Sequence, residues 1–384
     1  MTNRVPVLPH KILIVAGTRP EATKLAPVCL ALQSLPSMFE PRLLVTGQHR
    51  EMLDEALANF GLKPDYDLNV MLPAQDLFEV AARMLAGMRP VMDEFAPACV
   101  VVQGDTTSTL IGALAGYYRK AVVAHVEAGL RTGDKFGPYP EEANRRMVAV
   151  LADLHFAPTE TARRNLLAEG VAAAAIHVTG NTVIDALQWV LVNRAPDFRS
   201  RYGARLEAMA AVPFVLITCH RREIFGTAMA GVMEAIGRLA GEFPGLGFIF
   251  PVHLNPEVQQ AARQFLAGHA NVLLTDPLDY IHFTHLLKRC RFVLTDSGGV
   301  QEEAAALGRP AVVLRERTER SEGILAGAAV LAGIDPNRIL AIGRRLAGDA
   351  GYYDSMAAPT EVYGDGRAAQ RIVAHLEQYL GRKR

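Results

Sequence analysis

The chain has 384 residues, of which 50% are apolar and 21% are charged, and this size favours two domains of about 150–200 residues each. Its 40 Lys and Arg residues balance its 40 Asp and Glu residues, so no bulk charge attracts nucleic acid or an anionic membrane. The opening MTNRVPVLPHK has no apolar signal core, and no apolar run approaches the ~20 residues of a membrane span, so we expect a cytoplasmic protein.

Short β-branched or Leu-rich runs alternate with amphipathic stretches through the first half of the chain. The predicted strands begin at Lys11, Pro41, Ala98, Ala121, Leu154 and Ala175. The predicted helices between them include residues 21–34, 107–118 and 142–152. This alternation is typical of a parallel sheet with helices on both faces.

The same alternation restarts after Pro213, and a polar, Arg-rich stretch at 193–208 separates the two halves. The predicted strands of the second half begin at Phe214, Leu246, Val272, Phe292 and Ala311. Residues 366–380 have the pattern of one amphipathic helix. We therefore predict an α/β fold with two Rossmann-like doubly wound domains, 1–195 and 196–365, and a cleft between their strand ends.

Unusual polar residues gather directly after the predicted strands of both halves. In the first half they are Gly17-Thr18-Arg19, Gly47-Gln48-His49, Gly104-Asp105 and Glu127. In the second half they are His220-Arg221-Arg222, His253 and Asp296-Ser297-Gly298-Gly299. Ligands of open parallel sheets bind beyond the carboxyl ends of the strands, so this distribution predicts one shared site in the cleft.

A phosphate site is predicted where the segment from Ser297 to Glu303 leaves a strand and opens a helix. Gly298 and Gly299 allow close backbone approach, and the helix dipole favours an anion; the alternative is an ordinary Ser N-cap. Arg19 and Arg320 could add phosphate donors, and Glu303 could bind ribose hydroxyls. No G-x-G-x-x-G or P-loop motif is present, which argues against a dinucleotide cofactor or a P-loop nucleotide.

Four residues are candidates for proton transfer: Asp105, Glu127, Glu141 and His220. Each also has a structural alternative. Asp105 could cap a helix, Glu127 could pair with the nearby Arg131, Glu141 could pair with Arg145 four residues later, and His220 could lie on the surface. Together in one cleft, carboxylates, a histidine and arginines could move protons near a phosphorylated leaving group.

Metal and nucleophile motifs are absent from the sequence, which contains no H-E-x-x-H and no G-x-S-x-G. His282 and His285 are expected to be half-exposed helix residues rather than ligands. The four cysteines lack metal-like spacing and are expected to be buried thiols; they are Cys29, Cys99, Cys219 and Cys290. We therefore expect no metal site.

Ten short strings occur in the order found in bacterial non-hydrolysing UDP-N-acetylglucosamine 2-epimerases, and the chain resembles that family. They are GTRPEATK (from Gly17), GQHREML (from Gly47), QGDTTST (from Gln103), HVEAGLRTGD (from His125), YPEEANRR (from Tyr139), GNTVIDAL (from Gly180), TCHRRE (from Thr218), PVHLNP (from Pro251), DSGGVQEEAAALGRP (from Asp296) and TERSEG (from Thr318). No single string is specific, but the set is.

The resemblance implies a GT-B-like fold in which a carboxy-terminal helix, within 366–384, packs on the first domain. It implies interconversion of UDP-GlcNAc and UDP-ManNAc by a homodimer without a cofactor. The implied mechanism is anti elimination of UDP to a 2-acetamidoglucal, reprotonation of C2 on the other face, and re-addition of UDP.

Residues of this chain that match the family's catalytic positions are Asp105, Glu127, Glu141, Arg145 and His220. The resemblance implies that Glu127 and Glu141 transfer protons, Asp105 tunes them, Arg145 orients Glu141, and His220 lies near the diphosphate. The matching UDP contacts are Arg19, Lys24, Phe283, Ser297, Gly298, Gly299, Glu303 and Arg320, with Phe283 near the uracil.

Several positions depart from the family pattern. Ile224 replaces the usual Asn, Ser321 a Pro, and Leu278 a Gln near the uracil. Glu51 and Ala74 stand where many members bind an activating second substrate molecule through a Gln and an Arg, so we expect that site to be lost. A UDP-2,3-diacetamido uronic acid sugar remains an alternative substrate. A hydrolysing epimerase, a GT-B glycosyltransferase and a non-catalytic UDP-sugar sensor remain alternative functions.

Overall fold

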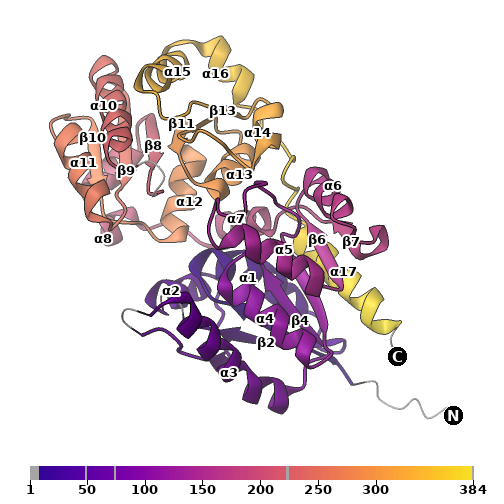
Figure 1. Ribbon diagram of the computed structural model, residues 1–384. Helices are drawn as coiled ribbons and strands as arrows, with labels where there is room; N and C mark the ends of the chain where they lie inside the picture. Colours follow the sequence, from indigo (N-terminus) through magenta and orange to yellow (C-terminus); the bar gives the residue numbers. More distant parts are fainter. Residues whose placement is uncertain (1–7, 48–49, 73–74, 222–224, 383–384) are drawn as a thin grey trace. The chain divides into compact units, whose positions relative to one another are not determined.

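The computed structural model describes residues 8–47, 50–72, 75–221 and 225–382, with the backbone alone at 50–52. The chain divides into two compact units (Figure 1). Unit 1 comprises Met1–Gln188 and Gly364–Arg384, and unit 2 comprises Trp189–Tyr363. The units therefore meet in sequence at two crossovers, 188/189 and 363/364, whereas the sequence analysis placed the divisions after 195 and 365.

Unit 1 contains a parallel sheet whose order is β3-β2-β1-β4-β5-β6-β7. Its strands are β1 (His10–Ala16), β2 (Phe39–Val45), β3 (Tyr66–Asp67), β4 (Cys99–Gln103), β5 (Val122–Val126), β6 (Leu154–Ala157) and β7 (Ile176–Val178). The central strands β1, β4 and β5 are buried on both faces, which explains their continuous runs of Ile, Leu and Val.

Helices cover both faces of this sheet. They are α1 (Arg19–Gln33), α2 (Arg50–Asn59), α3 (Leu77–Phe95), α4 (Thr107–Tyr118), α5 (Glu141–Leu151), α6 (Glu160–Ala168), the 3₁₀ turn η1 (Ala173–Ala175), α7 (Thr182–Asn193) and α17 (Ala368–Gly381). One core cluster joins Leu13 and Val15 of β1 to residues of α3, α4 and α5. The carboxy-terminal helix α17, yellow in Figure 1, lies in unit 1 and contacts α1.

Unit 2 repeats the same winding in a parallel sheet of order β10-β9-β8-β11-β12-β13. Its strands are β8 (Phe214–Thr218), β9 (Gly247–Pro251), β10 (Val272–Thr275), β11 (Phe292–Thr295), β12 (Ala311–Val313) and β13 (Ala329–Leu331). In both units the order reverses beside the first strand, so the loops after β1 and β4, and those after β8 and β11, flank a switch point where ligands bind in such folds.

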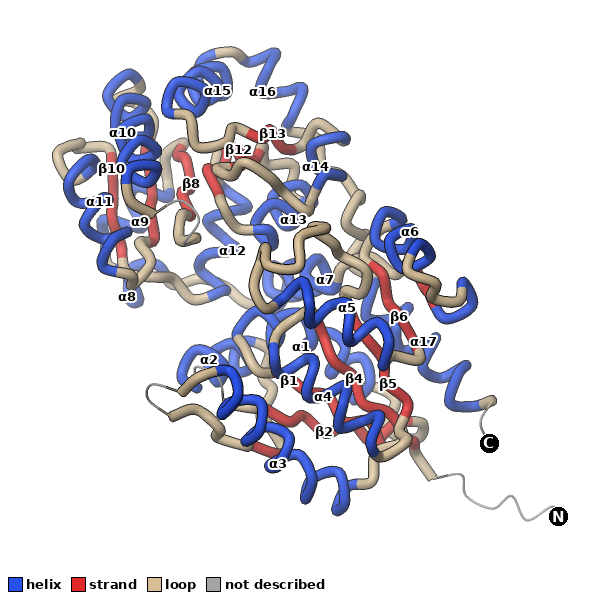
Figure 2. The backbone as a smooth tube through the Cα atoms, in the orientation of Figure 1, coloured by secondary structure: helices blue, strands red, loops and turns tan. Residues whose placement is uncertain are grey.

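The helices of unit 2 form two layers around this sheet, as the blue and red segments of Figure 2 show. They are α8 (Phe198–Tyr202), α9 (Ala204–Ala210), α10 (Thr227–Glu242), α11 (Pro256–Leu266), α12 (Tyr280–Arg289), α13 (Gly298–Ala306), α14 (Ser321–Leu325), α15 (Pro336–Gly348) and α16 (Ala350–Met356). Alternate residues of β8 enter opposite cores: Val215 and Ile217 face α10 and α15, whereas Phe214 and Leu216 face α9 and α12.

These findings confirm the predicted α/β class with two Rossmann-like folds. Within the described residues, no helix combines the length and the apolar character that a bilayer span needs. One local prediction is wrong. His282 is buried at 7% exposure, because its ring lies between the carboxylate of Asp279 and the backbone N–H of Asp197.

Candidate functional site

Glu127 lies directly after β5 at the carboxyl edge of the unit 1 sheet. Its backbone is left-handed, with φ of 63°, which costs a residue with a side chain roughly 1–2 kcal/mol. Its carboxylate, in a residue only 8% exposed, accepts hydrogen bonds of 2.5 Å from Lys24 Nζ and from Gln103 Nε2. A strained backbone conformation persists only where the surrounding structure stabilises it. Here the side chain of Glu127 is fixed by the ammonium group of Lys24 and the amide of Gln103.

Asp105, in the loop after β4, is tied to the first turns of α5. Its carboxylate accepts from Arg145 at 2.9 Å from Nε and 2.7 Å from Nη2, and its backbone carbonyl accepts from Asn144 Nδ2 at 2.9 Å. Arg145 is buried and also donates to Glu142 at 3.0 Å. These contacts fix the amino-terminal end of α5, and with it Glu141, against the loop that follows β4.

Glu141, the first residue of α5, differs from its neighbour Glu142. The Oε2 atom of Glu141 is buried and has no hydrogen-bond partner among the described residues. Glu142 is fully buried and accepts from Thr132 N, Gly133 N and two arginines. A buried acceptor without a partner is costly, so its presence calls for an explanation. The Oε2 atom of Glu141 is therefore available to accept a proton from a ligand.

The predicted orientation of Glu141 by Arg145 stays a prediction. Arg145 bridges Asp105 and Glu142, and Glu142 lies three residues earlier on the same helix face. Three- and four-residue spacings place side chains equally close, so sequence spacing alone could not choose between Glu142 and Glu141. Asp105 and Glu142 together hold the Arg145 guanidinium at the start of α5.

Glu21 is a buried carboxylate beneath this edge that sequence reasoning did not single out. It accepts from the backbone N–H groups of Gly17 and Thr18 at 2.8 and 2.7 Å, and from the hydroxyls of Thr106 and Thr109 at 2.5 and 2.8 Å. Burial raises the pKa of Glu21, and these hydrogen bonds oppose that rise. Its position three residues after Thr18, as in a capping box, was the available signal.

Two buried histidines support the same edge. His125, in β5, is 2.7 Å through Nε2 from the Gly104 carbonyl, and burial lowers the pKa of His125 to about 3. His155, its register partner on β6, has its pKa lowered to about 4, again by burial. Both rings are therefore neutral at pH 7, and His125 supports the loop before Asp105 through its contact with Gly104.

At the carboxyl edge of the unit 2 sheet, Asp296 organises the loop after β8. Asp296 is fully buried, and its Oδ2 accepts from the backbone N–H groups of His220 and Arg221 at 2.6 and 2.7 Å. His220 Nδ1 lies 3.0 Å from Oδ1, and the imidazole stacks on that of His253 with 5.7 Å between centroids. Interaction with His220 lowers the pKa of Asp296 against the opposing effect of burial. Asp296 therefore sets the orientation of His220.

Arg320 packs against the amino-terminal end of α13. It is 6% exposed and donates to Glu302 at 2.9 Å and to Glu319 at 2.7 Å. A Cβ on Gly298 would lie 3.1 Å from the guanidinium carbon, so this glycine permits the close approach. Glu319 also accepts from Arg315, and the two arginines hold the pKa of Glu319 at about 2 despite its burial. The guanidinium is thus fixed beside the helix end, where an anion is favoured.

The other predicted residues of unit 2 lie around the same helix end. Ser297 is the N-cap residue of α13, but its side chain makes no capping hydrogen bond, so the alternative of an ordinary Ser cap does not hold. Glu303 is buried and accepts from the Tyr280 hydroxyl at 2.6 Å. Phe283, on α12, packs partly buried against the core cluster of α9, α12 and α13. Among the residues of unit 1, Arg19 is exposed at the start of α1.

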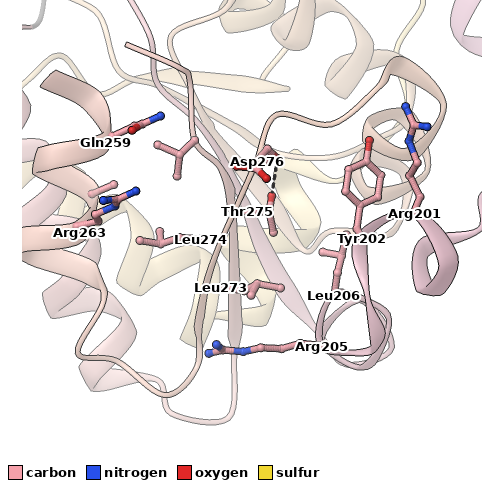
Figure 3. Close-up of a pocket in the computed structure, with 12 residues that line it drawn as sticks. Arg201, Tyr202, Arg205, Leu206, Gln259, Arg263, Leu273, Leu274, Thr275 and Asp276 are labelled. Carbon is pink, nitrogen blue, oxygen red and sulfur yellow. Dashed lines mark hydrogen bonds between the residues drawn. The ribbon is translucent and has the colours of Figure 1, made fainter. Parts of the chain in front are cut away.

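A separate pocket of about 490 Å³ lies in unit 2 beside the edge strand β10, and Figure 3 shows its lining. Leu273, Leu274 and Thr275 come from that strand, and flanking residues come from α8, α9 and α11. None of the predicted site residues lines it. The candidate residues of each unit therefore lie at the strand-end edge of its own sheet and not at this pocket.

Comparison with known proteins decides the family. A sequence model described as UDP-N-acetylglucosamine 2-epimerase matches residues 31–377. A UDP-N-acetylglucosamine 2-epimerase of Yersinia pestis is 46% identical over 372 residues, covering 96% of this chain and 99% of that protein. One from Escherichia coli K12 is 46% identical over 374 residues, covering 96% and 98%.

The chain belongs to the UDP-N-acetylglucosamine 2-epimerase family. A crystal structure of a family member from Neisseria meningitidis bound to UDP-GlcNAc has 41% identity and a TM-score of 0.88, covering 96% of this chain and all of that one. The resemblance that the ten strings indicated is therefore confirmed, and so is the fold that it implied.

Some epimerase-family positions lie outside the described residues: Gln48, His49, Ala74, Arg222 and Ile224, together with the side chain of Glu51. Leu278, which replaces a family Gln, is buried in the unit 2 core. Sequence reasoning missed three residues that hold the predicted ones: Glu21, Gln103 and Glu302. It placed Asp296 at a strand end but gave it no role. Each of the four adjoins or lies within a matching string, but only spatial contact shows its role.

Proposed function

We propose that the chain catalyses the reversible C2 epimerisation of UDP-N-acetylglucosamine to UDP-N-acetylmannosamine without an added cofactor. The observation that carries the proposal is the pair of carboxylates at the carboxyl edge of the unit 1 sheet. Glu127 is held between Lys24 and Gln103, and Glu141 has a buried oxygen without a partner among the described residues. A family member solved with UDP-GlcNAc supports the choice of ligand.

The proposed reaction needs two proton transfers at C2, one on each face of the sugar. A carboxylate removes the C2 proton, the C2–H electron pair forms the C1=C2 bond, and the C1–O bond breaks to release UDP. The reverse step delivers a proton to the other face of C2 while an oxygen of UDP re-forms the bond to C1. Glu127 and Glu141 are the proposed proton carriers, and the Asp105–Arg145 pair tunes them.

Departure of UDP requires stabilisation of a developing diphosphate charge, which the unit 2 edge is proposed to supply. Arg320, the backbone N–H groups at Gly298 and Gly299, and Ser297 could donate to phosphate oxygens, with His220 near the leaving oxygen. Glu303 and Phe283 are proposed to contact the nucleoside. Arg19 and Lys24 of unit 1 complete the proposed set, so that residues of both units act on one substrate.

A homodimer is also part of the proposal. Several large apolar side chains on α4 and α5 are exposed to solvent; they are Tyr117 (59%), Tyr118 (61%), Met147 (46%) and Val150 (85%). Exposed apolar groups of this size are typical of an interface, and a second copy of the chain would cover them. Light scattering of the purified chain should give twice the monomer mass of 41.7 kDa.

The experiment that tests the proposal is proton NMR of the purified chain with UDP-GlcNAc in deuterated water. We expect UDP-ManNAc to appear with deuterium at C2 and without accumulation of UDP. Accumulated UDP with free sugar would indicate a hydrolysing enzyme, and a product formed only with an acceptor would indicate a glycosyltransferase. An unchanged C2 proton with intact binding would contradict epimerisation and indicate a sensor.

A further inference from the structure

Tyr363 is buried at 2% exposure, and its hydroxyl holds the main chain on both sides of Ser321. The hydroxyl donates to the carbonyl of Arg320 at 3.0 Å and accepts from the backbone N–H of Gly323 at 2.8 Å. A Cβ on Gly323 would lie 2.8 Å from that hydroxyl oxygen, so the contact requires a glycine there. One phenol therefore fixes the backbone of the segment that carries Arg320.

The side chain of Arg320 is fixed independently of its backbone. Glu302 and Glu319 accept from the guanidinium, which rests against Gly298 at the start of α13. With the carboxylates holding one end and Tyr363 holding the other, the position of the guanidinium depends on both. A shift of the Arg320 backbone would strain or break the hydrogen bonds that aim the guanidinium at the helix end.

Tyr363 is also the last residue of unit 2 before the second crossover. The next residue, Gly364, has φ of 123°, and a Cβ there would lie 3.0 Å from the Cα of Gly180 in unit 1. Asp365 pairs with Arg371 at 2.7 Å, and Arg371 donates to the Thr179 carbonyl at 2.9 Å. The crossover is therefore anchored in unit 1 on one side and, through the phenol, to Arg320 on the other.

We infer that Tyr363 is a positioning residue for diphosphate binding, linking the crossover at 363/364 to the guanidinium of Arg320. The inference rests on the proposed function, because it assumes that Arg320 contacts UDP. Tyr363 itself touches neither the reacting sugar carbons nor the proton carriers in this assignment. Its removal should therefore change the affinity for UDP and for the UDP-sugar more than the chemical step.

The test is isothermal titration calorimetry of the full-length chain with UDP, comparing wild type with Tyr363→Phe. Loss of the hydroxyl removes its hydrogen bonds to the Gly323 N–H and the Arg320 carbonyl, and we expect roughly five- to tenfold weaker UDP binding. KM should rise by a similar factor while kcat stays within about twofold. The control is Tyr353→Phe, which removes a hydroxyl from a half-buried tyrosine of α16 whose ring lies over Arg291.

A double-mutant cycle separates positioning from general destabilisation. If Tyr363 acts through Arg320, Tyr363→Phe should have no further effect on UDP affinity in an Arg320→Gln background. A lowered melting temperature with unchanged UDP affinity, or fully additive effects in the cycle, would overturn the inference. Absence of UDP binding by the wild type would instead refute the proposed function, and the inference with it.

Discussion

The sheets of the two units have the same doubly wound topology, but the charged side chains at their carboxyl edges are paired differently. In unit 2, Arg320 and Glu319 belong to a buried network in which each charge meets an opposite charge. In unit 1, Arg145 is similarly satisfied by Asp105 and Glu142, yet Glu141 keeps a buried oxygen without a partner among the described residues. A fixed, compensated network suits a group that binds an anion, whereas an unsatisfied carboxylate suits one that exchanges a proton.

The largest expected effect follows from removing a proton carrier from unit 1. Glu127→Gln or Glu141→Gln should lower C2 deuterium exchange and epimerisation by roughly 10²–10⁴-fold, because an amide cannot accept the proton. UDP affinity, assigned mainly to residues of unit 2, should largely persist. NMR in deuterated water and calorimetry with UDP measure the two properties separately. Glu160→Gln, on an exposed side chain of α6, is the matched control, and near-normal turnover of either variant would refute the assigned role.

A smaller effect is expected from crowding the guanidinium in unit 2. Gly298→Ala would place a Cβ 3.1 Å from an Arg320 side chain that two carboxylates prevent from moving, and we expect roughly tenfold weaker UDP binding. Gly268→Ala, where no atom lies within 4 Å of the added Cβ, controls for the substitution itself. If the two variants bind UDP with equal affinity, Arg320 does not contribute to diphosphate binding.

The two units should also differ in their response to acid. Unfolded histidine titrates near pH 6.5, whereas His125 and His155 of unit 1 have pKa values of about 3 and 4. The unfolded chain therefore binds more protons below pH 6.5, and unit 1 loses stability as the pH falls from 6.5 toward 4. Asp185, whose pKa burial raises to about 6, and Glu21, whose pKa burial also raises, act in the opposite direction. Burial also lowers the pKa values of His177 and His375 in unit 1, and these two groups add to the loss.

In unit 2 burial lowers the pKa of one histidine, His285, and the larger loss of stability is expected at lower pH. Glu319 has its pKa held at about 2, so its stabilising effect is present above pH 4.5 and disappears as the pH falls toward 2. Hydrogen exchange monitored by mass spectrometry at pH 7, 5 and 4 should show protection lost first in β5 and β6. Simultaneous loss in both units would contradict this order.

The smallest expected change is in the steepness of that acid response. His125→Gln retains a donor for the Gly104 carbonyl but takes up no proton, so the stability of unit 1 should fall less between pH 6.5 and 4. Urea unfolding at both pH values measures the difference. A slope equal to that of the wild type would show that His125 does not contribute to the acid sensitivity.

The sequence by itself determined the alternation of strands and helices in both units, and the carboxyl edges of the two sheets at which polar residues gather. Continuous apolar runs such as those of β4 and β5 fit only strands buried on both faces, and parallel strands bring their following loops to one edge. The ten strings also identified the family. These features are local in the chain, so spacing and composition reveal them.

Only the tertiary structure decided which charges meet. Arg145 contacts Asp105, 40 residues away, and Tyr363 contacts the Arg320 carbonyl, 43 residues away. Glu21 and Glu302 look like ordinary polar positions of a helix until packing buries them beside their partners. Pairing energies depend on distance and burial, which the fold sets and which the order of residues along the chain does not contain.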